Sequence, residues 1–330
     1  MQRKFGIRGL GFYAPETVLT NADLEKLVDT SDEWVKSRTG IAERRIVSEG
    51  QGCSDLAFEA AQMALDDAGM EPSELTHILV GTFTPDHYIP SCACMLQHKL
   101  GITGCMAMDL GAACSGFLYS LETARGIVAL HPEAKVLVVG SEVVTSRINF
   151  TDRTTCVLFG DAAGAVVLTA ADDNCFALVE DVILRADGSQ NGLLTVTGGA
   201  SLHPPKLHGQ VDESYFVRMN GREVFKHAVR NMDAATRELL ARNDLVSKDI
   251  DVFIPHQANM RIIEALAKRM DYPREKIYVN LERYGNTSAA SIPVALAEAR
   301  IEGFIPSPST VVLTSFGGGL TWASALLRFV

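Results

Sequence analysis

Residues 109–125 read DLGAACSGFLYSLETAR. A buried strand is predicted to end near Leu110, a run of three small residues allows a tight turn, and a helix begins at about Cys114. Residues 281–300, LERYGNTSAASIPVALAEAR, repeat this arrangement, because a small-residue loop again leads into a helix. The first helix ends on SLETAR at 120–125 and the second on the similar ALAEAR at 295–300, which indicates a duplicated fold.

Corresponding segments of the two halves are separated by a nearly constant number of residues, and the same separation recurs earlier in each half. An amphipathic helix pattern at 54–69 precedes the apolar strand HILVG at 77–81, and a similar pattern at 224–243 precedes DVFIP at 251–255. The next predicted strands are CMAMDL and VLVVG in the first half, and KIYVNL (276–281) and TVVLT in the second. Each half then closes with a Phe-Gly turn and a final strand.

Each half is therefore predicted to run strand, helix, strand, helix, strand, strand, with the halves at 1–173 and 174–330. Continuous apolar strands of this kind belong to sheets that are covered on both faces. We expect an α/β fold of two similar units packed about a pseudo-twofold axis. The first half carries an insertion near 141–158, SEVVTSRINFTDRTTCVL, and insertions on a duplicated scaffold often serve a pocket or an interface.

Composition excludes several classes of protein. The chain has 330 residues, 47% hydrophobic and 21% charged, which is enough for a large core in about two domain-sized units. Its formal net charge of −10 argues against a nucleic-acid-binding protein. No apolar run reaches the ~18 residues that a membrane span requires. The N-terminal MQRKFGIRGLGF is predicted to be a strand rather than a signal peptide.

The chain contains seven cysteines, and most lie in apolar segments. This odd number indicates reduced thiols and a cytoplasmic location. Cys92 and Cys94 form a Cys-x-Cys pair without a second Cys/His pair, so we interpret them as structural and expect no metal site. Basic residues gather between 218 and 276 against the acidic average, either as a solvated helix face or as a docking patch for an acidic partner.

Cys114 is the candidate nucleophile. It follows a tight turn after a buried strand and lies in or near the first turn of the next helix. Free N–H groups and a partial positive charge at a helix start favour the thiolate over the thiol. A buried, unreactive cysteine is the alternative that this residue alone leaves open.

Two further polar residues lie at corresponding places. His256, in DVFIPHQANMRI, corresponds to Thr82 and follows an apolar strand, at the strand end where ligands bind in α/β proteins. Asn286 lies on a loop that corresponds to Gly111. Singly, they fit a core histidine and a turn asparagine. Together with Cys114 they supply a nucleophile and two hydrogen-bond donors, which thioester chemistry requires.

The motifs DLGAACSGF, PHQAN, GNTSAAS and FGGGLTW, in this order, resemble the β-ketoacyl-acyl-carrier-protein synthase III group of the thiolase superfamily. The resemblance extends over essentially the whole chain, from TSDEW and RTGI to the last strand. It implies a thiolase-like five-layer αβαβα fold built from two duplicated α/β halves, and a homodimer.

The resemblance also implies a ping-pong condensation. An acyl-CoA acylates Cys114, and malonyl-acyl carrier protein then loses CO2 so that its carbanion attacks the acyl-enzyme, which initiates fatty acid synthesis. Matching positions assign His256 and Asn286 to stabilising the enolate. The backbone N–H groups of Cys114 and Gly318 would form a second oxyanion hole. Coenzyme A thioesters are substrates here, and no resident cofactor is implied.

Substrate-binding residues follow from the same resemblance. They are Trp34, Arg38, Arg153 and Asn259 for coenzyme A, and Lys226 and Arg261 for the carrier protein. Trp34 and Arg153 would sandwich the adenine, and cation–π and stacking interactions suit these residue types. Arg38 would meet a phosphate, and Asn259 the pantetheine arm.

Ile89 and Phe316 are expected to line the acyl pocket, with Ile89 reaching across the dimer into the partner's pocket. Family members restricted to acetyl often carry phenylalanine at this position, whereas this chain has isoleucine. The smaller side chain predicts a short primer, from acetyl to about butyryl or a short branched acyl group. An ordinary core role for Ile89 is the alternative.

Other functions fit less well. A thiolase normally needs a second cysteine in the C-terminal glycine-rich turn, which here reads SFGGGLTW, and elongating ketoacyl synthases use two histidines. A related condensing enzyme of specialised metabolism that loads an unusual acyl group stays open. So does a non-catalytic acyl-CoA-binding protein, against which Cys114, His256 and Asn286 argue.

Overall fold

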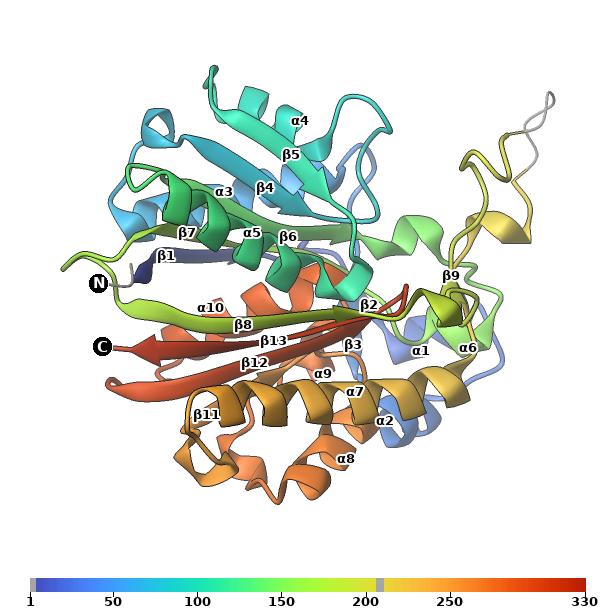
Figure 1. The fold of residues 1–330 in the computed structure, drawn as a ribbon. Helices are drawn as coiled ribbons and strands as arrows, with labels where there is room; N and C mark the ends of the chain where they lie inside the picture. Colours follow the sequence, from blue (N-terminus) through green and yellow to red (C-terminus); the bar gives the residue numbers. More distant parts are fainter. Residues whose placement is uncertain (1–3, 206–210) are drawn as a thin grey trace.

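The computed structural model describes residues 4–205 and 211–330 (Figure 1). Its strands are β1 (Phe5–Tyr13), β2 (Val18–Thr20), β3 (Glu43–Arg45), β4 (His77–Gly81), β5 (Met106–Leu110), β6 (Val136–Val143), β7 (Asp161–Ala170), β8 (Ala177–Ala186), β9 (Leu194–Thr195), β10 (Arg218–Met219), β11 (Val252–Pro255), β12 (Ser309–Gly317) and β13 (Thr321–Phe329). Its α-helices are α1 (Asn21–Leu24), α2 (Asp32–Thr39), α3 (Cys53–Ala68), α4 (Cys92–Lys99), α5 (Gly116–Leu130), α6 (Arg153–Cys156), α7 (Gly221–Arg242), α8 (Met260–Met270), α9 (Leu281–Tyr284) and α10 (Ser291–Ile301).

Within residues 4–205 and 211–330, the main sheet has nine strands in the order β11-β12-β13-β8-β1-β7-β6-β4-β5. Strands β5, β4 and β6 run parallel, as do β11 and β12, and the remaining pairs of this sheet are antiparallel. The sheet consists of a first group of strands, β1, β7, β6, β4 and β5, and a second group, β8, β13, β12 and β11. The two groups meet where β1 pairs with β8, at Gly6 with Leu178 and Ile7 with Ala177. The sheet therefore continues from one half of the chain into the other.

Helices cover the strands in layers, which gives the αβαβα arrangement (Figure 1). Helices α3 and α4 pack on the strands of the first group, and α7 packs on β12 and β13 of the second. Helices α5 and α10 lie between the two groups and contact strands of both. Strands β6 and β12 are buried along their whole length, because helices cover both of their faces.

The order of elements repeats between the halves, with one difference from the sequence prediction. The strand expected at 276–281 is not formed, and this segment pairs with β11 only through an isolated bridge between Phe253 and Ile277. The side chain of Gln257 takes the place of a strand partner, because its Nε2 donates to the carbonyl of Tyr278 and its Oε1 accepts from the N–H of Asn280. The boundary at 173/174 stays a prediction.

The two central helices begin in the same way. A 3₁₀ turn precedes each of them, at Ala113–Ser115 before α5 and at Ser288–Ala290 before α10. Ala113 and Ser288 open these turns in the left-handed region, with φ of 45° and 51°. The two turns pack against each other, so the residues that follow the duplicated small-residue loops meet at the centre of the molecule.

The insertion predicted near 141–158 is partly the end of β6 and partly a loop with the short helix α6. It lies beside the small strand β9 (Figure 1), and the N–H of Val217, the residue before β10, donates to the carbonyl of Arg147 in this insertion at 2.8 Å. Over the part of the chain that the structure describes, no helix is both long and apolar enough to cross a lipid bilayer.

Candidate active site

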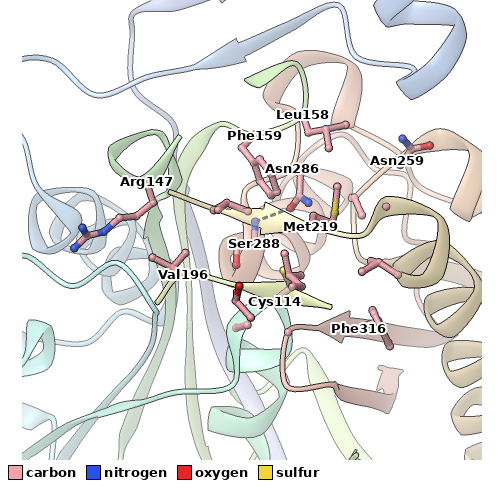
Figure 2. A pocket seen from close by; sticks show the side chains of 18 of the residues that line it. Cys114, Arg147, Leu158, Phe159, Val196, Met219, Asn259, Asn286, Ser288 and Phe316 are labelled. Atoms are coloured by element: carbon pink, nitrogen blue, oxygen red, sulfur yellow. Dashed lines mark hydrogen bonds between the residues drawn. The ribbon is translucent and has the colours of Figure 1, made fainter. Parts of the chain in front are cut away.

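A cavity of about 1100 Å³ opens beside the two 3₁₀ turns. Cys114, His256 and Asn286 all line it, so the structure brings the three candidate residues to one space. Figure 2 shows Cys114 and Asn286 with Ser288 and Phe316 around this space. The residues come from both halves of the chain, Cys114 from the first and His256 and Asn286 from the second.

Cys114 lies in the 3₁₀ turn before α5 and is 9% exposed. The chain at Gly317 passes so close that a Cβ there would lie 2.7 Å from the backbone nitrogen of Cys114. Only glycine allows this approach. Gly318, the next residue, lines the same cavity as Cys114.

The electrostatic environment of Cys114 differs from the sequence expectation of a thiolate. The pKa of the thiol is raised to about 12, chiefly by burial; the charge of Glu142 adds to this rise, whereas hydrogen bonding by Ser288 acts against it. The sulfur is enclosed before the helix proper begins, so loss of water outweighs the partial charge of the helix start. Cys114 is therefore a neutral thiol in the resting protein, and its reaction needs a proton acceptor.

His256 follows β11 and is 3% exposed. Burial lowers the pKa of the imidazole to about 4, so the ring is neutral at pH 7. Its Nδ1 lies 2.5 Å from the hydroxyl of Ser291, the first residue of α10. This contact occupies Nδ1 and leaves Nε2 as the nitrogen that can act on a bound ligand.

Asn286 lies on the loop between α9 and the second 3₁₀ turn. Its backbone N–H donates to the carbonyl of Leu158 at 2.8 Å, and its carbonyl accepts from the N–H of Gly160 at 3.1 Å. Its side-chain Oδ1 accepts from the backbone N–H of Ser288 at 2.9 Å, shown as a dashed line in Figure 2. Because Oδ1 is occupied by an obligate donor, the amide NH2 is the part of the side chain that is left to bind a ligand.

The residues predicted for coenzyme A also line the cavity: Trp34, Arg38, Arg153 and Asn259. The guanidinium of Arg153 lies 5.0 Å from the centre of the Trp34 ring. An adenine between them needs about 7 Å, two ordinary contact distances, so Arg153 would have to move aside for the predicted sandwich. Asn259 caps α8, because its side chain accepts from the N–H of Arg261 at 2.9 Å.

Lys226 and Arg261, predicted for the carrier protein, are exposed and line the same cavity from α7 and α8. Lys226 forms an ion pair of 2.7 Å with Glu223, and Arg261 lies 5.9 Å from the centre of the Phe225 ring. Elsewhere in this basic region the charges serve packing, because Arg237 and Arg269 both bind the buried Asp233.

The two residues predicted for the acyl pocket are placed differently. Phe316 is 4% exposed and lines the cavity. Ile89 is 89% exposed and is not part of the lining, although Tyr88 before it is. In a single chain Ile89 therefore does not contribute to the site, and its predicted role depends on a partner subunit.

Three residues of the site were missed in the sequence: Glu142, Ser288 and Ser291. Glu142 is fully buried at the end of β6 and accepts a hydrogen bond from Ser288. A charged residue inside the apolar run VLVVGSEVV was the available signal, because charges are rare in buried strands. Ser288 and Ser291 lie in the motif GNTSAAS, where no pattern singles out either of them.

Among the described residues, no three His, Cys, Asp or Glu side chains gather as metal ligands. What the cavity holds is a thiol, a neutral imidazole and an amide in a largely apolar interior, with cationic side chains exposed around it. This arrangement suits attack on a thioester by the thiol and stabilisation of a negative oxygen by the two donors.

Comparisons with known proteins identify the family. The family model "3-Oxoacyl-[acyl-carrier-protein (ACP)] synthase III" matches residues 108–188, and the model of the C-terminal part of this family matches residues 240–329. The beta-ketoacyl-[acyl-carrier-protein] synthase III of Nitratidesulfovibrio vulgaris (strain Miyazaki F) is 55% identical over 324 residues, which cover 98% of this chain and 97% of that protein. The enzyme of the same name from Oleidesulfovibrio alaskensis is 54% identical and covers 99% of this chain and 100% of its own.

Solved structures show the same fold. The crystal structure of 3-oxoacyl-[acyl-carrier-protein] synthase III from Aquifex aeolicus superimposes with a TM-score of 0.89 at 45% identity, covering 98% of this chain and 100% of that one.

Proposed function

This chain belongs to the 3-oxoacyl-[acyl-carrier-protein] synthase III family, and we infer that it joins an acyl-CoA primer to malonyl-acyl carrier protein through an acyl-Cys114 intermediate. It is an acyltransferase-type condensing enzyme that initiates fatty acid synthesis. The products are 3-oxoacyl-acyl carrier protein, coenzyme A and CO2. The assignment of residues is carried by the cavity of about 1100 Å³ that Cys114, His256 and Asn286 share.

The first half-reaction is acylation of Cys114. The sulfur attacks the thioester carbonyl, and negative charge develops on the carbonyl oxygen. Backbone N–H groups are suited to that charge, and Cys114 and Gly318, which both line the cavity, would supply them. Coenzyme A then leaves, and the acyl chain occupies the space beside Phe316.

The second half-reaction is decarboxylation and condensation. Loss of CO2 from the malonyl group leaves an enolate, whose charge lies on the thioester oxygen. Nε2 of His256 and the amide of Asn286 donate to this oxygen. A single such donor lowers the activation barrier by about 3–4 kcal/mol. The support for these roles is that Nδ1 of His256 and Oδ1 of Asn286 are both occupied by other groups.

Recognition of the two substrates uses the cationic residues around the cavity. Trp34 and Arg153 hold the adenine once Arg153 has moved, and Arg38 holds a phosphate. Lys226 and Arg261 attract the acidic carrier protein, as their exposure on α7 and α8 supports. We place the enzyme in the cytoplasm, where its seven free cysteines would stay reduced.

The active enzyme is a homodimer in this proposal. Strand β5 ends the sheet order and pairs with β4, so its other edge offers unpaired backbone groups to a second chain. Met106 on that strand is 40% exposed, and Tyr88 and Ile89 nearby in the chain are 73% and 89% exposed. A partner at this edge would cover these apolar side chains and bring Ile89 to its pocket.

The roles of His256 and Asn286 separate the two half-reactions. His256→Ala and Asn286→Ala should still gain an acyl group from acetyl-CoA, measured by intact mass. Malonyl decarboxylation by each variant should fall by about 10²-fold or more, in line with loss of one oxyanion donor. Decarboxylation at the wild-type rate in both variants would contradict this division of roles.

A further inference from the structure

Glu142 is a buried carboxyl group that the reaction above does not use. It lies at the end of β6, in a strand whose every residue is buried, and its own exposure is 0%. A carboxylate that is removed from water is costly unless its oxygens are bonded. A carboxylate at this position therefore needs hydrogen-bond donors, and two segments that are far apart in the sequence supply them.

Five neutral donors bind Glu142. Oε2 accepts from the hydroxyls of Thr82 at 3.0 Å and Thr84 at 2.5 Å, and from the backbone N–H groups of Phe83 at 3.1 Å and Thr84 at 3.2 Å. Oε1 accepts from the hydroxyl of Ser288 at 3.1 Å. Burial raises the pKa of this carboxyl to about 7, and these hydrogen bonds act in the opposite direction. Glu142 can thus change protonation near neutral pH.

Ser288 connects Glu142 to the nucleophile. Its hydroxyl donates to Oε1 of Glu142, and its oxygen keeps lone pairs that can accept from the thiol of Cys114. Cys114 lines the same cavity, and the two 3₁₀ turns that carry these residues pack together. Figure 2 shows the two side chains next to each other. The φ of 51° at Ser288 and the bond from its N–H to Asn286 fix the residue that carries this hydroxyl. Ser288 can therefore accept a proton from sulfur while it donates its own to Oε1 of Glu142.

The other titratable groups around Glu142 are less directly connected. Cys53 on α3 reaches it only through Thr82, with 3.5 Å between Sγ and the hydroxyl oxygen, and Cys92 on α4 lies behind Cys53 at 3.7 Å between the sulfurs. Asp161, opposite Val143 in β7, binds Val47 and Thr145 instead. Cys114 is thus the titratable group that the Ser288 contact links to Glu142.

We propose that Glu142 stores the thiol proton of Cys114, through Ser288, between the two half-reactions; the proposal rests on the acyl-Cys114 function above. During loading, the S–H bond of Cys114 breaks, its proton joins the Ser288 oxygen, and the Ser288 proton passes to Oε1 of Glu142. The sulfur bonds to the acyl carbon, and coenzyme A leaves as a thiolate that takes a proton from water.

The stored proton returns in the second half-reaction. The malonyl carboxylate leaves as CO2, the enolate carbon bonds to the acyl carbon, and the Cys114 sulfur departs as a thiolate. Glu142 then returns its proton through Ser288 and is again a carboxylate. One proton is consumed overall, by coenzyme A, so the cycle closes without another acid or base.

The test is the pH dependence of single-turnover loading from acetyl-CoA. In the wild type, loading should rise with pH as Glu142 ionises and level off above about pH 7. In Glu142→Gln and in Ser288→Ala, this inflection should vanish and loading at pH 7 should fall by about 10²-fold, as for a lost general base. Glutamine keeps an oxygen for the backbone donors and an NH2 for Ser288, so the site can still form.

Without a proton relay, electrostatics alone predicts that loading becomes faster when the charge of Glu142 is removed, because this charge raises the pKa of Cys114. Glu298→Gln is the matched control, because Glu298 is a buried carboxyl that accepts from the hydroxyls of Tyr278 and Tyr284. It should leave the loading profile unchanged. Glu142→Asp keeps a carboxyl group and should retain the inflection.

A second measurement separates this role from a structural one. Malonyl decarboxylation by the unacylated enzyme needs no proton from Cys114, so Glu142→Gln and Ser288→Ala should keep most of it. Equal loss of loading and decarboxylation, or loading of Glu142→Gln at the wild-type rate or faster, would overturn the proton store. A wild-type protein that is not acylated at Cys114 at all would overturn the proposed function instead.

Discussion

The hydroxyl of Ser291 lies 2.5 Å from Nδ1 of His256. Both groups are buried, and the imidazole is neutral at pH 7 because burial lowers its pKa to about 4. A neutral ring carries one hydrogen, so a Ser291 hydroxyl that donates to Nδ1 places that hydrogen on Nε2. This is the form of His256 that can donate to an enolate oxygen.

Ser291→Ala should therefore impair the second half-reaction. Without the hydroxyl the ring loses one hydrogen bond, worth about 1 kcal/mol, and can adopt the other tautomer. We expect malonyl decarboxylation to fall at least about fivefold while loading of Cys114 stays near the wild-type rate. Ser120→Ala is the control, since the Ser120 hydroxyl is equally buried but bonds the carbonyl of Gly116 within α5. Unchanged decarboxylation in Ser291→Ala would show that the serine does not set the tautomer.

Trp34→Ala should weaken binding of the nucleotide part of acyl-CoA. The ring contacts Arg153 at 5.0 Å and would stack on the adenine, and such contacts are worth about 1 kcal/mol. The KM for acetyl-CoA should rise about fivefold. The KM for an acetyl thioester of N-acetylcysteamine, which lacks the nucleotide, should not change. An equal loss with both substrates would assign Trp34 to packing.

Lys226→Glu combined with Arg261→Glu should weaken the reaction with the carrier protein. Both residues are exposed at the cavity, so reversing their charge repels an acidic partner. The KM for malonyl-acyl carrier protein should rise about tenfold, with acetyl-CoA loading unchanged, and the wild-type KM should rise with salt.

Lys248→Glu combined with Lys268→Glu makes the same charge change away from the cavity and serves as the control. If this pair raises the KM as much as the first, net charge and not a docking surface sets the interaction.

Ile89 should set the length of the primer through the dimer. Each methylene that finds a buried place contributes about 0.8 kcal/mol, so Ile89→Phe should narrow loading toward acetyl-CoA and Ile89→Gly should admit octanoyl-CoA. The measurement is the ratio of loading rates for acetyl-, butyryl- and octanoyl-CoA. Identical ratios in the three proteins would leave Ile89 without a role in selectivity.

Much of the fold could be predicted, because the duplication leaves its pattern in the sequence. A nearly constant offset between the halves aligned the strands and the central helices. The structure gives Ala113 and Ser288, which correspond under this offset, the same left-handed backbone. The segment 276–281 was mistaken for a strand, since an apolar pattern cannot reveal that Gln257 occupies its backbone groups.

The sequence predicted which residues gather at the site better than it predicted their protonation states. Motifs identified Cys114, His256 and Asn286, which line the cavity. The protonation of Cys114 depends on enclosure by segments far apart in the chain, which no local pattern encodes. Glu142 was visible as a charge in an apolar strand, but its partners come from the end of β4 and the second 3₁₀ turn and appear only after folding. The place of Ile89 depends on a second chain.

The most direct measurement of the central claim is the intact mass of the protein after incubation with acetyl-CoA, followed by peptide mapping. Wild-type protein should gain one acetyl group on Cys114, and Cys114→Ala should gain none while remaining folded. Cys94→Ala, which removes an exposed thiol, should load like the wild type. An acetyl group on Cys114→Ala, or on another cysteine of the wild type in place of Cys114, would contradict the account.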